Sequence, residues 1–430
     1  MKKIVPIFIL LLGISITNVT AQNSLTRGGS VYSSFGLGTP VDYLSPQASA
    51  MGLQGVAVFS PQRPSLANPA FWGNSFFTTI SAGMELNYFD ASDVTGSSEN
   101  TNINFTYAQV VIPILKNRLG ASLAMFPETQ NRFDLNRIVN VDLPSASGPV
   151  PSDVEQTISG TGGINRLELG FGARIMDDLF VGYAPSLLFG VTRQDNSFLF
   201  DGAAFRTIDY RIQTRHIAMG HRFGVFGTIR NTFRNRDRFD IGATLSLPVD
   251  LKANRRLIND LGALGTVDIA SEEVLGERNI SYPLMAALGI SYSPTRYLLF
   301  STELLYQQWG DTNNFDPTAL NYTTDRMRLG LGLEYNVYQA GNRGLFNSLI
   351  YRAGASYDTG HLQIEGKNIE TLLLSFGLGI PSRSSGSMLD LSFDYGFRGT
   401  ESNNLVRERI FAFRVSFNLS EVMFIQRRFN

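Results

Sequence analysis

The alternation of apolar and polar side chains near the C-terminus constrains the fold of this chain more than any other feature. From Met388 to Leu419, on either side of a polar break at 399–404, large apolar residues alternate with charged, polar or small ones. The apolar set is Leu389, Leu391, Phe393, Tyr395, Phe397, Phe411, Phe413, Val415, Phe417 and Leu419. A period of two predicts β-strands, because successive side chains of a strand point to opposite faces.

Strands of this kind fit two architectures of opposite polarity. A soluble, β-rich secreted protein would bury the apolar face in a core, whereas a transmembrane barrel turns that face to lipid and the polar face to its lumen. The 41 glycines, the 31 phenylalanines and a near-neutral mean hydropathy suit a barrel whose polar lumen balances an apolar outside. The net charge of −1 gives no field that would attract nucleic acid.

The first 21 residues have the features of a secretory signal peptide. Lys2 and Lys3 precede an apolar stretch at 4–16, and Val19-Thr20-Ala21 predicts cleavage after Ala21. The apolar stretch is shorter than the roughly 20 residues of a transmembrane helix, and no later stretch reaches that length without charges. There is no cysteine, which excludes disulfides, thiol catalysis and cysteine metal sites. We therefore expect an exported, all-β protein.

From residue 76 to the C-terminus, the alternation predicts a transmembrane antiparallel β-barrel of 14 strands. The count is even, as in single-chain bacterial barrels, and short turns alternate with longer polar loops such as 251–276, as periplasmic turns and external loops do. The expected strands are 76–90, 101–114, 118–142, 153–175, 179–200, 206–230, 237–252, 277–293, 296–310, 323–339, 346–359, 361–380, 387–399 and 405–420.

Charged residues recur on the faces that would point into the lumen. Because both signs mix at every level, a salt-bridge network that also anchors the N-terminal segment is a better interpretation than a path for charged ligands. The residues are Glu85, Arg166, Glu168, Arg174, Glu303, Arg328, Glu334, Arg352, Asp390, Asp394, Arg398 and Arg414.

The sequence contains no arrangement that predicts catalysis. His216 and His221 are five residues apart on one predicted strand, so they face opposite ways and cannot share a metal ion. No Gly-x-Ser-x-Gly motif is present, and the arginines at 234–238 are interrupted by Asp237. We expect neither an enzyme nor a bound cofactor or metal.

Pro113 and Pro127 lie within or beside the second and third predicted strands. Proline cannot donate to a strand ladder, so each marks a strand end, a bulge or a gap in pairing. A strand end near the membrane interface is one interpretation. The other is a local opening in the wall, through which a ligand would leave sideways.

Residues 22–75 precede the first expected strand and are too apolar for a solvated tail. Gly52, Gly55 and Ala57, followed by Asn68-Pro69-Ala70 and then a barrel, resemble the FadL-type outer-membrane transporters of hydrophobic compounds. The resemblance implies that residues 22–75 form a hatch inside the lumen. It also implies that Gly52, Gly55, Asn68, Pro69 and Ala70 belong to that hatch or its ligand site, and that Pro127 marks a lateral opening.

The resemblance implies passive transport of hydrophobic small molecules such as long-chain fatty acids across the outer membrane. Expected partners are outer-membrane lipid, the hydrophobic ligand and, during insertion, the barrel-assembly machinery. Family members often carry an acidic residue before Asn-Pro-Ala, but none occurs between Gln54 and Asn68. The alternative is a barrel that resembles PorV and acts as a scaffold or shuttle in protein secretion. A lumen tightly packed by the hatch would favour the scaffold, and a continuous apolar cavity would favour transport.

Overall fold

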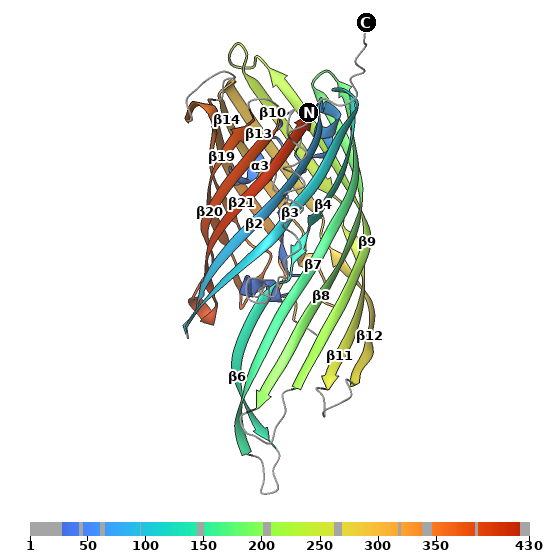
Figure 1. Cartoon of the computed structure of the whole chain (residues 1–430), viewed down its shortest axis with the longest axis vertical. Coiled ribbons are helices and arrows are strands. Elements are labelled where there is room, and N and C mark those ends of the chain that lie inside the picture. Colours follow the sequence, from blue (N-terminus) through green and yellow to red (C-terminus); the bar gives the residue numbers. More distant parts are fainter. Residues whose placement is uncertain are drawn as a thin grey trace, which may run out of the picture.

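The alternating segments pair into one closed antiparallel barrel (Figure 1). The structure is a computed structural model that describes residues 28–42, 46–60, 65–94, 96–143, 150–200, 208–261, 269–316, 320–337, 346–382 and 386–421. The predicted signal peptide lies outside the described residues. No helix within these ranges is long and apolar enough to cross a membrane.

The described part of the wall consists of 17 strand segments. They are β2 (Thr78–Ser92), β3 (Ser97–Leu115), β4 (Leu119–Pro127), β6 (Phe133–Leu143), β7 (Val150–Met176), β8 (Leu179–Phe200), β9 (Ile208–Arg230), β10 (Arg238–Ser246), β11 (Val249–Leu261), β12 (Ile269–Tyr282), β13 (Met285–Thr295), β14 (Leu298–Gln307), β15 (Arg326–Asn336), β16 (Ile350–Asp358), β19 (Thr371–Pro381), β20 (Met388–Gly399) and β21 (Arg407–Glu421).

Three strands of the wall are each interrupted once. The first consists of β4 and β6, which both pair with β7. The second consists of β10 and β11, which both pair with β9. The third consists of β12, which pairs with β11, and β13, which pairs with β10. When each interrupted strand is counted once, the described wall has 14 strands, and β2 pairs with β21 to close it. The predicted fold class and strand number are therefore confirmed.

Short elements make up the remaining regular structure. Five of them lie inside the barrel: η1 (Val31–Ser34), β1 (Thr39–Pro40), α3 (Pro46–Ser49), η2 (Pro69–Asn74) and β5 (Thr129–Gln130). The others lie in connections between wall strands: η3 (Trp309–Asp311), η4 (Phe346–Ser348), the pair of β17 (Gln363–Ile364) and β18 (Lys367–Asn368), and η5 (Ser402–Asn404).

Several predicted strand limits were wrong. Residues 361–370 are a loop with the small β17–β18 hairpin. Gly360, just before it, and Gly366, within it, have positive φ angles that end strand geometry. The expected loop at 251–276 is mostly strand, since β11 runs to Leu261 and β12 starts at Ile269. The residues toward the ends of these two strands are polar, so their sequence resembles that of a loop.

The polarity of the barrel excludes the soluble alternative. Outward residues such as Leu372, Phe376 and Phe417 are about half exposed (49%, 55% and 58%), whereas the inward Glu303 and Asp390 are buried. Together the outward apolar residues form a belt around the wall, here called the apolar belt. This is the arrangement of a membrane barrel, with apolar side chains toward lipid and charges inside.

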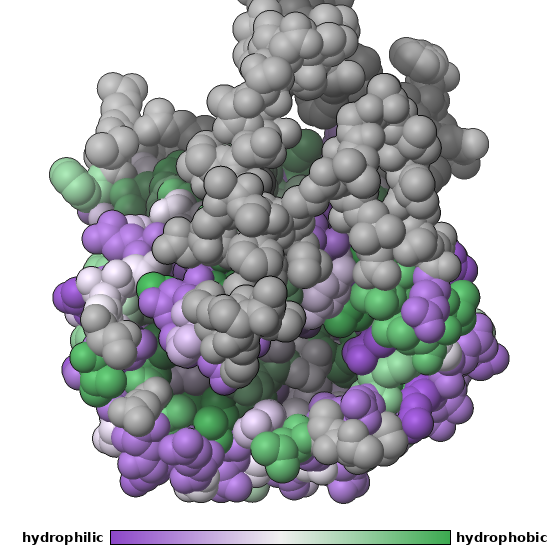
Figure 2. Space-filling view, turned by 90° about the horizontal axis from the view of Figure 1, so that it is seen from below, coloured by the Kyte–Doolittle hydropathy of each residue, from purple (hydrophilic) through white to green (hydrophobic). Residues whose placement is uncertain are grey.

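The two ends of the barrel differ. The tight connections at 116–118, 177–178 and 296–297 lie at one end, here called the short-turn end, together with the start of β2 and the end of β21. At the other end, here called the loop end, β6, β7, β8, β9, β11 and β12 reach far below β20, β21 and β2 in Figure 1. Seen from the loop end, the molecule has a largely polar rim around a hollow that contains apolar side chains (Figure 2).

We predict that Gly354→Val disrupts the interior of the barrel. A Cβ atom at Gly354 would lie 2.0 Å from the carbonyl oxygen of Met51, so the segment inside the lumen would have to move. The expected cost is about 1–3 kcal/mol of stability, as for other overpacked cores. Thermal unfolding in detergent measures it. Gly96→Val is the matched control because nothing lies within 4 Å of its Cβ position, and equal melting temperatures for the two variants would contradict the prediction.

Candidate functional site

The described residues of 28–75, here called the plug segment, lie inside the barrel against the inward face of the wall. Met51 and Leu53 pack against Leu299 of β14, and Val56 and Ala67 pack with two further wall residues, Ala287 and Leu305. Near the short-turn end, η2 contacts β4, β7, β8 and β9. The role of this segment as a movable hatch stays a prediction.

Glycines on the wall allow the plug segment to approach very closely. A Cβ atom at Gly242 would lie 1.9 Å from the carbonyl oxygen of Val56, and one at Gly182 would lie 2.2 Å from the carbonyl carbon of Pro69. The plug therefore rests on the bare backbone of the wall strands. These contacts explain why so many inward positions are glycine rather than polar residues.

The Asn68-Pro69-Ala70 motif is a buried turn that joins the plug to β9. The side-chain oxygen of Asn68 accepts a hydrogen bond from the Ala70 backbone N–H at 3.0 Å and caps η2. Its amide donates to the carbonyl oxygens of Val56 at 2.9 Å and Val225 at 3.0 Å. Pro69 occupies the first position of η2, where its missing N–H costs nothing. The motif thus fixes the plug in place.

Glu303 of β14 binds the glycine-containing run of the plug. Its carboxylate accepts backbone N–H hydrogen bonds from Gln54, Gly55 and Val56 at 2.8, 2.8 and 2.9 Å. Gly55 has a φ of +94° and Gly52 a φ of +68°, conformations that favour glycine. The plug has no acidic residue between Gln54 and Asn68, and here the wall supplies the carboxylate.

A second charged contact holds the plug residues just before Asn68. Arg222 of β9 donates to Glu168 of β7 at 2.5 and 3.0 Å and to the carbonyl oxygens of Leu66 and Ala67 at 2.8 and 2.9 Å. Both side chains are almost fully buried. Arg222 was not among the predicted lumen residues, although its position between Gly220 and Gly224 in the alternation marks it as inward.

Asp42 of the plug pairs with two arginines of β15. It lies 3.0 Å from Arg326 and also contacts Arg328. Burial alone would raise the pKa of the Asp42 carboxyl, but the two guanidinium groups outweigh burial and hold that pKa well below its usual range. Asp358 of β16 completes the group, 2.5 Å from Arg326. Sequence reasoning found only Arg328 of these four.

Other predicted lumen charges form ion pairs inside the barrel. Arg352 lies 2.8 Å from Glu334 and 2.5 Å from Asp390, and the amide of Gln47 in the plug donates to Glu334 at 2.7 Å. Arg414 contacts both Glu85 and Asp394, and Arg166 contacts Glu128, which precedes β5.

The remaining two predicted charges differ in environment. Arg398 lies 3.6 Å from Glu408, which accepts hydrogen bonds from Ser30 and Val31 of the plug. Arg174 does not join the lumen network, because it lies beside the turn at the short-turn end and pairs with Asp177 there at 2.6 Å. Its place at a strand end, where the lumen opens, explains the difference.

The wall is interrupted beside Pro127. β4 ends at that proline, and the chain turns inward so that β5 pairs with β1 of the plug. β3 pairs with β4 only from Ala108 onward, and β6 pairs with β7 but not with β3. In the described wall, residues 97–107 of β3 therefore pair on one side only, with β2. Pro113, by contrast, lies near the end of β3 at a register shift.

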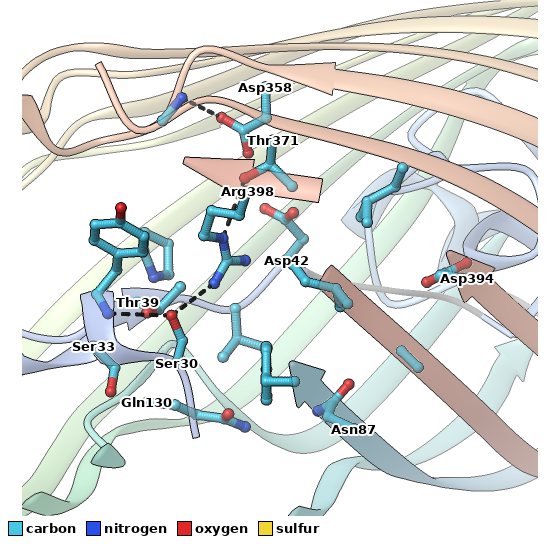
Figure 3. A pocket seen from close by; sticks show the side chains of 18 of the residues that line it. Ser30, Ser33, Thr39, Asp42, Asn87, Gln130, Asp358, Thr371, Asp394 and Arg398 are labelled. Atoms are coloured by element: carbon cyan, nitrogen blue, oxygen red, sulfur yellow. Dashed lines mark hydrogen bonds between the residues drawn. The ribbon is translucent and has the colours of Figure 1, made fainter. Parts of the chain in front are cut away.

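A cavity of about 170 Å³ lies inside the barrel next to this interruption (Figure 3). On the polar side, Ser30, Thr39 and Asp42 of the plug face Asp358, Thr371 and Arg398 of the wall. Arg398 donates to Ser30 at 3.1 Å and to Thr371 at 3.2 Å. Apolar lining residues are Phe89, Leu362, Ile369, Leu373 and Ile410. The cavity is therefore amphipathic rather than a continuous apolar channel.

The histidines do not form a metal site. His216 is buried 3.3 Å from the Thr192 hydroxyl, and His221 lies 2.8 Å from the Tyr183 hydroxyl on the outside of the wall. Within the described residues, no group of three or more His, Cys, Asp or Glu side chains is placed to hold a metal ion.

We predict that Arg222→Met is far more destabilising than the double change Arg222→Met with Glu168→Leu. The single variant leaves a buried carboxylate without its cation, which costs about 3–5 kcal/mol, whereas replacing both partners by apolar residues is often nearly neutral. Chemical unfolding in detergent measures both. Arg211→Met, which breaks the exposed pair with Asp195, should cost about 0–1 kcal/mol. Equal losses for the single and double variants would contradict the prediction that the unpaired Glu168 carboxylate is the main cost.

The loop at 359–370 should lose stability as the pH falls. His361 is buried there against Trp309, and burial, followed by the charge of Arg326, lowers the pKa of its imidazole to about 3. In the unfolded chain the group takes up a proton near pH 6.5. The contribution of neutral, buried His361 to the free energy of unfolding is therefore fully present above about pH 6.5 and declines toward pH 3.

The melting temperature at pH 7 and pH 4.5 tests this prediction. His361→Gln should show a smaller drop between the two values than the unmodified protein, since glutamine does not titrate. An equal drop in both proteins would show that His361 contributes nothing to the pH dependence.

Comparison with known proteins places the chain in a family and a fold. Its solved neighbours include a FadL homologue from Pseudomonas aeruginosa (TM-score 0.60, 13% identity, 90% of this chain and 99% of that chain covered). They also include the toluene transporters TbuX of Ralstonia pickettii (0.53, 15%, 88% and 98%) and TodX of Pseudomonas putida (0.54, 13%, 90% and 99%).

No curated protein matches the sequence. At these identities the solved neighbours show the fold alone, which is that of FadL-type outer-membrane barrels. The sequence profile of the BamG family matches residues 1–430. This match spans the whole chain, and the protein therefore belongs to the BamG family.

Proposed function

We propose that this protein is a permanently plugged outer-membrane barrel that acts, without catalysis, as an accessory partner of the barrel-assembly machinery. In this proposal the lumen is a structural core, and the outer surfaces and loops carry the function. The observation that supports it is the set of buried charges that join the plug to the wall, at Glu303, Arg222, Asp42, Glu334 and Glu408.

The energetic cost of moving the plug is the physical argument. Displacing it would leave Glu303 without three backbone donors and would strip Arg326 and Arg328 of Asp42. Leaving one buried partner of such a pair uncompensated costs about 3–5 kcal/mol. Several such contacts, distributed along the lumen, would have to break together before the lumen opened.

The family name supports the same proposal. The chain belongs to the BamG family, and the Bam prefix suggests an association with barrel assembly. A surface role also fits the cavity beside Pro127, which is small, at about 170 Å³, and is lined in part by charged side chains. We propose that the partner is another protein of the outer membrane and that no cofactor is used.

Sideways passage of a small hydrophobic or amphipathic compound is a second candidate. The cavity beside Pro127 supports it, together with the transport activity named for the toluene-transporter neighbours. Its volume of about 170 Å³ is close to that of an engineered cavity of about 150 Å³ that binds benzene. A long-chain fatty acid would need much more space, so we propose a monoaromatic-sized ligand for this route.

Locking the plug to the wall distinguishes the two candidates. The hydroxyl oxygens of Ser49 in the plug and Ser392 in β20 are 2.8 Å apart, and the chain has no cysteine of its own. Ser49→Cys with Ser392→Cys should therefore form one disulfide in the oxidising cell envelope. In cells that depend on this variant, we expect normal levels of folded outer-membrane barrels and normal co-purification of the assembly machinery.

The two single-cysteine variants are the controls, and a gel-shift on reduction verifies the crosslink. Loss of barrel assembly only in the crosslinked protein would contradict a static plug. If the assembly machinery never co-purifies, and native mass spectrometry instead finds a small lipophile bound to the unmodified protein, the transport candidate replaces the proposed function.

A further inference from the structure

A groove on the outside of the wall lies at the loop-end margin of the apolar belt. It has a volume of about 790 Å³ and is formed by β8, β9, β11 and β12. Its lining includes Phe189, Val191, Arg215, Ile217 and Lys252. This groove is separate from the lumen, the plug and the cavity beside Pro127.

The strand register shows which of these side chains face outward. Ile217 is directly opposite Phe189 on one side and Lys252 on the other. Leu251 and Ala253, which flank Lys252 in sequence, are buried in the interior cluster, so Lys252 faces the outside. Ile217 is 52% exposed and shares the outward face with it.

The groove carries an excess of positive charge. Arg215 and Lys252 project from its outward face, against one outward acidic residue, Glu277, whose carboxylate accepts a hydrogen bond from Asn254 at 2.7 Å. Arg215 and Lys252 are both exposed, and neither has an ion pair to another described residue. They are diagonal neighbours on adjacent strands, roughly 7–8 Å apart at the backbone, so their long side chains can converge on one anion.

The apolar half of the groove continues into the belt. Phe189 and Val191 of β8 and Ile217 of β9 form its wall, and the next outward pair toward the short-turn end is Leu187 and Met219. A ligand that fills the groove therefore meets cations at one side and a lipid-facing hydrocarbon surface at the other. An acyl lipid with an acidic head group has this chemistry, and a soluble anion lacks the apolar part.

We propose that this groove binds a phosphorylated acyl lipid of the leaflet at the loop end. The phosphate contacts Arg215 and Lys252, and an acyl chain lies along Phe189, Ile217 and Met219. In an outer-membrane barrel the longer loops face the cell exterior, so this is the outer leaflet. Basic pockets at membrane surfaces bind anionic head groups in the same way, with each Lys or Arg adding favourable energy.

Lipid retention by the purified full chain tests the proposal. The protein is exchanged in detergent into diphosphoryl lipid A, and bound lipid is measured by native mass spectrometry. We expect Arg215→Gln with Lys252→Gln to weaken retention at least about tenfold, the scale of one to two basic residues at a membrane surface. Arg234→Gln with Lys367→Gln removes the same two charges from exposed connections elsewhere and should retain lipid normally.

Two further probes identify the source of the phosphate. Lipid A without its phosphates should bind at least about tenfold more weakly than the diphosphoryl form. Inorganic phosphate in excess should not displace the bound lipid, because it lacks acyl chains. Equal binding of the dephosphorylated lipid, full displacement by inorganic phosphate, or unchanged retention in the Arg215 and Lys252 double variant would each overturn the proposal. Thermal unfolding of each variant verifies that the barrel is intact.

Discussion

The charges buried between the plug segment and the wall are the interaction on which this structure depends. Within the apolar belt of a membrane barrel, ionised side chains face the lumen, and in a lumen filled by protein they must find partners there. Glu303 and Arg222 find them in the backbone of the plug, and Asp42 finds them in Arg326 and Arg328. Barrel and plug therefore form one core, and neither satisfies its polar groups without the other.

Close backbone packing complements these charges. At Gly354, Gly242 and Gly182, the wall offers bare backbone to the plug, and Asn68 binds carbonyl oxygens on both sides of the contact. The contacts are short and numerous enough that small displacements of the plug create clashes or unpaired groups. This rigidity is the reason we propose that function lies at the surfaces of the protein rather than in passage through its lumen.

At the interruption beside Pro127, a segment of the wall enters the interior and pairs with the plug. There the third strand leaves the wall, contributes β5 to the interior, and returns as β6. The amphipathic cavity beside it is small because the plug enters the same space. A FadL-type fold thus retains a break in its wall while its interior is occupied, and fold likeness alone does not decide whether anything passes through.

The sequence by itself determined the class of fold, because alternation is a local property of a strand. The period of two at 388–419, the even number of segments and the inward position of charges such as Arg352 all follow from it. It also placed Asn68-Pro69-Ala70 before the first strand of the wall. The limits of β11 and β12 were misjudged because polar strand residues beyond the belt resemble loops. The start of β19 was misjudged because residues 361–370, predicted as strand, form a loop in which Gly366 has a positive φ angle.

Only the tertiary structure decided which charges meet. Arg222 and Glu168 are 54 residues apart, and Asp42 and Arg326 are 284 apart. Their contact depends on strand register and on the path of the plug through the lumen, which no local pattern encodes. The same is true of the outer groove, where Arg215 and Lys252 are diagonal neighbours because β9 and β11 pair in one particular register. Periodicity tells which way a side chain points, and register decides what it meets.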